Sequence, residues 1–434
     1  MQQSPITFAS LLGLLFTVVL FPEQVNALCD CKYEDHACFP ADGDLLKDAV
    51  DKFIDGDWDG KINDVYYGSN MSEWCTGNVT DMAFLFDGAE EFNQDISEWD
   101  LSSVKDMSSM FQAATSFNQD ISDWDVSKVQ YMTGMFYGAS SFNKDIRLWN
   151  TSSVEDMSSM FTGAPSFNQD ISDWDVSEVE DMSSMFRGAT SFNQDISDWD
   201  VSKVQSMYSM FREASSFNQA ISDWDVSKVE DMYGMFYGAT SFNQAISDWD
   251  VSKVQYMDSM FFGATAFNQD ISDWDVSKVE DMDSMFFGAT AFNQDISGWD
   301  LESITNMQSM FYGASSFNQN LCAWKYKDFP YGPAAYNIFL DSACIFPADP
   351  VLEDQGPFCS DDCGAPSSTP SSNPSRSSEP SSQPSSLSAP PSMSSEPSSV
   401  PSPSKSGKGK AGKGKAGKGK ESKALIKIRM KLWE

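Results

Sequence analysis

Histidine is almost absent from this chain, whose 434 residues include only one, His36. A Ser/His/Asp or Cys/His catalytic site would depend on that residue. The sequence also lacks the G-x-G-x-x-G, P-loop and H-E-x-x-H motifs. Its many carboxylates repeat identically, whereas acid–base catalysis needs two carboxyl groups in different environments. We therefore predict a protein that is not an enzyme and that has no cofactor in the usual sense.

Basic residues are scarce over most of the chain and gathered at its end. The formal charge is −36, from 28 Lys and Arg against 64 Asp and Glu. Residues 405–434 hold 11 basic and 2 acidic residues, which leaves 17 basic and 62 acidic residues, a charge of −45, on residues 1–404. Such a polyanion excludes nucleic acid as a partner of the body. The polycationic tail suits an anionic polysaccharide, mineral or membrane surface.

One apolar run opens the chain, and it is short for a membrane span. Ile6–Phe21 is uncharged over 16 residues and is followed by a small-residue cleavage pattern that ends at Ala27. We predict a signal peptide over 1–27 and an extracellular, cell-surface or cell-wall location. Glycosylation is expected at the N-x-S/T sites Asn70, Asn78 and Asn150.

Cysteine is missing between residues 76 and 321, with four cysteines on either side. An even count in a secreted chain predicts disulfides, and we expect them to staple a cap at each end of the chain's middle, with the pairing left open. The alternative is a zinc cluster that includes His36, although the spacing fits none of the common zinc patterns. The cysteines are Cys29, Cys31, Cys38, Cys75, Cys322, Cys344, Cys359 and Cys363.

The middle of the chain is a repeat of 25 residues. Tryptophan recurs at this interval without a break from Trp74 to Trp324. A unit so small cannot bury its own apolar face, so the units must stack on one another. We assign the repeated tryptophans to the core of the stack: Trp99, Trp124, Trp149, Trp174, Trp199, Trp224, Trp249, Trp274 and Trp299.

Apolar spacing within a repeat predicts two elements. Ile171–Val176 has the L-x-x-L-x-L spacing of a leucine-rich coil and the alternation of a short strand. Val179–Ala189 then carries a Met and Phe stripe at helical spacing, which we interpret as core rather than as a ligand groove. Ser177 with Glu180 resembles a capping box, and Gly188 stands where a helix C-cap needs a left-handed residue.

These elements predict an α/β repeat solenoid, leucine-rich-repeat-like, with one short parallel strand and one short helix per 25-residue coil. Asn93 and its equivalents down to Asn318 each follow a phenylalanine in a turn. We expect their side-chain amides to satisfy turn backbone from coil to coil.

The recurring phrase F-N-Q-D-I-S-x-W-D-V-S-x-V-x-x-M-x-x-M-F-x-G-A resembles the BspA-like, mycoplasma-lipoprotein-type repeats of bacterial surface proteins. The resemblance covers roughly Trp74 to Trp324. It implies a leucine-rich-like solenoid on secreted or surface proteins that are often associated with adhesion. The acidic pattern of the phrase is broken at Arg147–Asn150, Ala220 and Ala245.

Changes in amino-acid composition along the chain indicate where its segments begin and end. The Ser/Pro-rich stretch lacks apolar residues for a core and predicts a disordered, extended stalk. The expected segments are a signal peptide 1–27, an N-terminal cap 28–74, the solenoid 75–324, a C-terminal cap 325–364, the stalk 365–404 and the basic tail 405–434.

Two columns of aspartate are expected on the outer side of the predicted strands. Adjacent carboxylates about 4.8 Å apart repel, which predicts counter-ions, raised pKa values or bound cations. Calcium prefers oxygen ligands, so Ca²⁺ is the candidate metal beside the simpler interpretation of a solvated acidic face. The second column comprises Asp123, Asp173, Asp198, Asp223, Asp248 and Asp273. The candidate ligands in the first are Asp100, Asp125, Asp175, Asp200, Asp225, Asp250, Asp275 and Asp300.

Three functions fit these features. The first is a non-catalytic binding or adhesion module whose solenoid meets a protein or glycan at a cell surface or in the matrix. The second is a structural cell-wall or mineral-associated component attached through the tail. An ice or surface-lattice binder is the third, although such faces favour threonine arrays.

Overall fold

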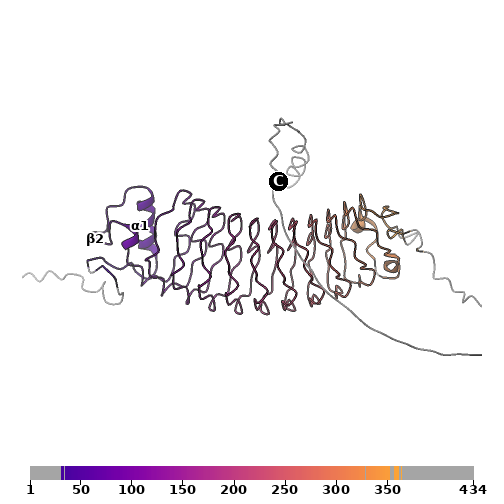
Figure 1. The fold of residues 1–434 in the computed structure, drawn as a ribbon, viewed down its shortest axis with the longest axis horizontal. Helices are drawn as coiled ribbons and strands as arrows, with labels where there is room; N and C mark the ends of the chain where they lie inside the picture. Colours follow the sequence, from indigo (N-terminus) through magenta and orange to yellow (C-terminus); the bar gives the residue numbers. More distant parts are fainter. Residues whose placement is uncertain (1–30, 34, 328, 352–355, 361–362, 364–434) are drawn as a thin grey trace, which may run out of the picture. The chain divides into compact units, whose positions relative to one another are not determined.

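The computed structural model describes residues 31–33, 35–327, 329–351, 356–360 and 363. These residues belong to the first of two units, Met1–Ser368 and Thr369–Glu434. The predicted signal peptide, stalk and basic tail lie outside the described residues. Over the described ranges, no helix is long and apolar enough to cross a membrane. The described residues form a row of coils between two caps (Figure 1).

Neighbouring coils are joined by a parallel backbone ladder. Single parallel bridges link equivalent residues every 25 positions from Asp81 to Asn306. Within a coil, the N–H groups of alternate residues such as Met107, Ser109 and Phe111 donate to carbonyls of the next coil at 2.8 to 2.9 Å. The chain is therefore a repeat solenoid, as the sequence predicts.

The prediction of a helix in each repeat is wrong. In Val179–Ala189, Asp181 forms a bridge and residues 183–188 form turns. Ser184 and Gly188 have φ values of 57° and 70°, a left-handed conformation that a right-handed helix cannot contain. The N–H groups of Met185 and Ala189 donate to the carbonyls three residues earlier. Each left-handed residue thus takes the third place of a turn, as in a type II turn. Gly188 has the predicted left-handed backbone, but it lies within a turn rather than at the end of a helix.

The predicted strand Ile171–Val176 is also a turn. The Trp174 N–H donates to the Ile171 carbonyl at 3.2 Å. Burial still alternates as predicted, with Trp174 buried and Asp175 exposed. The predicted capping box fails with its helix: the Asp175 Oδ1 accepts the Ser177 N–H at 3.0 Å, which closes a turn headed by aspartate.

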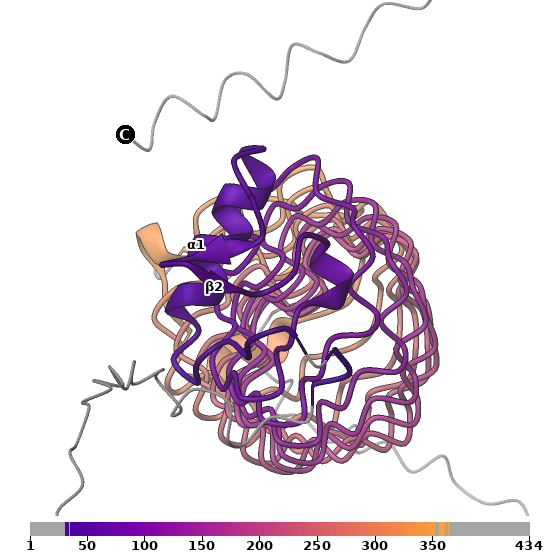
Figure 2. The same cartoon turned by 90° about the vertical axis from the view of Figure 1, so that its left-hand side faces the viewer.

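The core consists of the same apolar side chains from each coil, stacked in columns. The Phe111 and Phe136 rings lie 5.5 Å apart, and the Trp149 and Trp174 rings 6.3 Å apart. The Trp174 Nε1–H donates to the Ile146 carbonyl at 3.0 Å, so the buried indole is satisfied. Seen along the stack, the coils superpose as a ring around this core (Figure 2). One coil contributes Ile121, Trp124, Val126, Val129, Met132, Met135, Phe136, Ala139 and Phe142.

A ladder of side-chain amides runs along the stack, as the repeated asparagine predicts. The Asn143 Oδ1 accepts the Asn168 N–H at 3.0 Å, and the same bond recurs from Asn93 to Asn318. Gln169 adds bonds to the Asn143 carbonyl and Oδ1 at 3.1 and 2.8 Å, a role that the sequence interpretation missed. The turn backbone is thereby satisfied between coils.

The N-terminal cap covers the first coil. Helix α1, Asp44–Ile54, buries Leu46, Ala49 and Val50 at helical spacing. Two short antiparallel strands follow, β1 at Lys61–Ile62 and β2 at Val65–Tyr66, and then the 3₁₀ helix η1 at Met71–Glu73. The Thr80 N–H donates to the Ala41 carbonyl, so the cap extends the backbone pairing of the solenoid.

The C-terminal cap covers the last ladder edge. It contains the 3₁₀ helices η2, Cys322–Tyr326, and η3, Gly332–Ala335. The N–H groups of Met307 and Phe311 donate to the carbonyls of Ala334 and Ile338. The cap thus replaces the missing next coil and removes an open edge.

Disulfides join cysteines within each flank. Cys31 pairs with Cys75, Cys322 with Cys363, and Cys344 with Cys359. Cys38 is also disulfide-bonded, and Cys29 lies outside the described residues. The sulfurs of Cys31 and Cys38 are therefore not free thiolates, and the zinc alternative is not supported.

Candidate functional site

The coils are near copies of one another, and their largest differences lie on one segment. Across the nine coils that begin at residue 101, the positions equivalent to Ser108 and Gln112 each carry five residue types, more than any other position. Four residue types occur at the position of Asp106 on the same segment, and also at those of Lys105 and Asp123. We call the columns of Asp106, Ser108 and Gln112 the variable face. They alternate along the ladder with buried residues such as Met107 and Phe111. Their side chains point outward. In the Asp106 column, aspartate also accepts the backbone N–H two residues later, as Asp231 and Asp281 do at 2.8 Å.

Exposed apolar side chains also gather on this ladder segment. Between residues 76 and 321, six large apolar side chains are exposed, and five of them lie on it. Leu148 is the exception, at a position where other coils mostly have aspartate. These five side chains stand on several coils, so they mark one side of the stack as the exposed apolar side rather than forming a single patch. The five are Phe84, Tyr131, Tyr137, Tyr208 and Tyr256.

The Gln112 column becomes aromatic toward the C-terminal end. Ring centroids lie 4.4 Å apart for Tyr237 and Phe262, 4.5 Å for Phe262 and Phe287, and 4.7 Å for Phe287 and Tyr312. The rings are within 5° of parallel and half-buried. The Arg212 guanidinium lies 3.9 Å from the Tyr237 ring centroid and covers the first ring.

Four carboxylates lie in the other two columns of the variable face: Asp231, Asp258, Asp281 and Asp283. Asp258 and Asp283 each stand four residues before a ring of the aromatic column, Phe262 and Phe287. Burial raises the pKa of Asp258 to about 7, with further contributions from Asp281, Asp283 and Asp231. Burial also raises the pKa of Asp231. We call these carboxylates and the aromatic column the aromatic–acidic patch. The sequence interpretation missed it, although the patch could have been found by comparing repeats for where they differ.

The aspartates proposed as metal ligands are turn residues. In all eight, from Asp100 to Asp300, Oδ1 accepts the backbone N–H two residues later at 2.9 to 3.2 Å. The Ser127, Ser202 and Ser252 hydroxyl and N–H groups lower the pKa values of Asp125, Asp200 and Asp250 respectively. For these three aspartates, the alternative of a raised pKa is therefore wrong, because hydrogen bonds stabilise the charged form.

Lysines also offset the repulsion in this column. Lys203 and Lys228 contribute to the lowered pKa of Asp200. In the second column, Asp173 and Asp198 are exposed, and Arg147 lies 4.0 Å from the carboxylate of Asp173. Within the described ranges, no three His, Cys, Asp or Glu side chains are grouped so as to hold a metal ion. Calcium binding stays a prediction without a site in this part of the chain.

His36 lies in the N-terminal cap, where its side chain is only 5% exposed. Its Nδ1 is 3.0 Å from the Glu73 carbonyl, and its ring stacks on Tyr33. The sequons differ in access: Asn70 and Asn150 are exposed, whereas Asn78 is half-buried.

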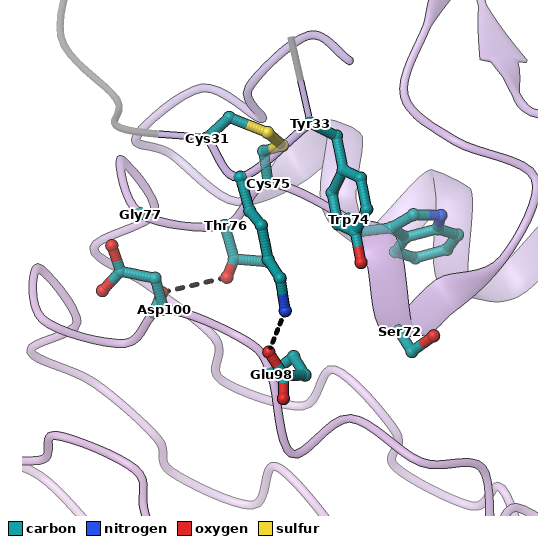
Figure 3. Close-up of a pocket in the computed structure, with 10 residues that line it drawn as sticks. Cys31, Tyr33, Ser72, Trp74, Cys75, Thr76, Gly77, Glu98 and Asp100 are labelled. Carbon is teal, nitrogen blue, oxygen red and sulfur yellow. Dashed lines mark hydrogen bonds and ion pairs between the residues drawn. A yellow bond between two sulfur atoms is a disulfide. The ribbon is translucent and has the colours of Figure 1, made fainter. Parts of the chain in front are cut away.

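A small pocket opens where the cap meets the first coil (Figure 3). The Cys31–Cys75 disulfide lies on one side. Lys32 pairs with Glu98 across it at 2.7 Å, and the Thr76 hydroxyl donates to the Asp100 carbonyl. Its polar groups are engaged with one another, which fits a joint between cap and coil.

Comparison with known proteins matches the repeats to one family. Its description is "Mycoplasma protein of unknown function, DUF285", and three overlapping matches cover residues 61–172, 144–249 and 235–331. No curated protein matches the chain. One similar solved structure is the "Crystal structure of TLR13-ssRNA13 complex", with 10% identity and a TM-score of 0.17 over 56% of this chain and 45% of that chain. This chain thus spans under half of that protein, and so remote a likeness supports no inference.

Proposed function

This chain belongs to the DUF285 family, and we propose that it is a secreted or cell-surface, non-catalytic binding module whose variable face contacts a partner at a cell surface or in the matrix. One observation carries the proposal: the two most varied positions of the repeat, those of Ser108 and Gln112, are outward columns of one ladder segment, which also holds five of the six exposed large apolar side chains between residues 76 and 321. A purely structural stack would have no reason to place its differences there.

The test compares attachment of three purified proteins to cell-wall and matrix preparations. These are the full chain, the chain without residues 405–434, and the full chain with Tyr131, Tyr208 and Tyr256 changed to Ser. We expect the triple variant to lose most attachment while the truncated chain keeps it. Changing Asp123, Asp198 and Asp223 to Ser is the matched control, since these residues lie outside the variable face. Loss on truncation alone would contradict the proposal and favour attachment through the tail.

A further inference from the structure

The aromatic column presents ring edges rather than ring faces. Each ring is stacked on the next at 4.4 to 4.7 Å, and Arg212 covers the outer face of Tyr237. A planar or sugar-like ligand that stacks on an aromatic side chain needs an uncovered ring face. The column therefore offers a continuous apolar strip for aliphatic side chains and offers little to a glycan.

The carboxylates of the patch form a local concentration of negative charge on successive coils. Of the ion pairs among the described residues, none involves Asp231, Asp258 or Asp281. The ladder position just before the variable face adds Glu230 and Glu280. Carboxylates on successive coils repel, and a cation placed among them would relieve the repulsion.

We infer that the aromatic–acidic patch binds a Lys/Arg-rich polypeptide segment that also carries aliphatic side chains, with the basic groups at the carboxylates and the aliphatic groups along the rings. This inference rests on the proposed function and specifies the partner of its variable face. The inference is supported by the opposite charges of the patch carboxylates and of Lys and Arg side chains, together with the apolar strip formed by the rings. The Arg212 guanidinium seated on Tyr237 shows a cation already accommodated at one end of the rings.

The test uses the full chain and a fluorescent ten-residue peptide of alternating Lys and Val, with an analogue in which Gln replaces Lys. We expect the Lys peptide to bind and the Gln peptide to bind at least about tenfold more weakly, which is about 1.4 kcal/mol. Asp258→Asn with Asp283→Asn, and separately Phe262→Ser with Phe287→Ser, should each weaken binding by a similar factor. Thermal melts check that all variants are folded.

The matched control is Asp248→Asn with Asp273→Asn, which replaces the same number of carboxylates at exposed positions ten residues earlier in the chain, outside the variable face. Its affinity should stay within about twofold at 0.15 M salt, since screening limits diffuse attraction. Equal weakening in patch and control variants would overturn the inference, and so would tighter binding of a neutral β-glucan oligosaccharide. If the peptide fails while surface attachment still depends on Tyr131, Tyr208 and Tyr256, the partner class is wrong and the proposed function stands.

Discussion

Each coil has one side whose residues are nearly the same in every repeat and another side whose residues vary between repeats. On one side, the Phe-Asn-Gln turn, the aspartate-headed turns and the tryptophan recur almost unchanged. On the other side, the variable face changes from coil to coil although its backbone ladder stays the same. The comparison distinguishes residues that stabilise the coil from residues whose side chains lie on its surface without a fixed structural role.

The constant side is constant because its polar groups have defined partners. The Trp199 Nε1–H donates to the Ile171 carbonyl at 3.1 Å, and the Asn193 Oδ1 accepts the Asn218 N–H at 2.9 Å. Removing either side chain leaves a buried or half-buried group unsatisfied. On the variable face, Phe262 and Asp258 stand at positions where other coils have Thr, Arg or Ser, so the backbone there tolerates many side chains.

The largest difference in the loss of stability is expected between substitutions of two aromatic residues, one on each side of the coil. Trp199→Ala should destabilise the protein by roughly 3 to 5 kcal/mol, because it empties a fully packed site. Phe262→Ser should cost about 1 kcal/mol, the stacking contribution of a half-buried ring. Denaturant unfolding of both variants at equal pH and salt measures the difference. Equal losses would remove the distinction between the two sides.

A smaller loss of stability is expected from substitutions in the ladder of side-chain amides. Asn193→Ala should cost about 1 to 3 kcal/mol, because the Asn218 N–H and the Gln219 amide both lose an acceptor. Asn193→Asp keeps the acceptor oxygen and should cost less. Chemical denaturation ranks the two variants, and a larger loss for Asp would show that the ladder does not depend on that oxygen.

A third effect on stability depends on pH. The pKa of Asp258 is raised by burial from 3.8 to about 7, so the folded protein holds this proton more tightly than the unfolded chain. Its contribution favours folding in acid and is lost as pH rises from about 4 to 7. Asp258→Asn should therefore raise Tm at pH 8 and change it little at pH 4.

Asp200 provides the control of opposite sign. Its pKa is lowered by the Ser202 hydroxyl and N–H, so its ionised form contributes stability above its unfolded pKa, and that contribution is lost as pH falls. Asp200→Asn should not raise Tm at pH 8. The same rise for both variants would show that overall charge, rather than the setting of Asp258, controls stability.

Some features of the coil could be predicted from residues alone, and others could not. The alternating burial around Trp174 and the column of stacked asparagines could both be predicted from the sequence. The first follows from the alternation of apolar and polar residues, and the second from an asparagine that recurs every 25 residues. The Met and Phe stripe also has a helical period, yet the left-handed Ser184 makes it a set of turns. Serine carries no sign of a positive φ, so that conformation could not be predicted locally.

The sequence by itself determined the 25-residue period, the buried columns and the segregation of cysteines to the two flanks, since stacking identical units leaves one arrangement for identical side chains. Only the tertiary structure decided which outward columns share a ladder and whether aspartates repel or cap turns. Those outcomes depend on hydrogen bonds and contacts between coils 25 residues apart, as in the gathering of Asp231, Asp258 and Asp281 on successive coils. Local patterns along one coil do not contain that information.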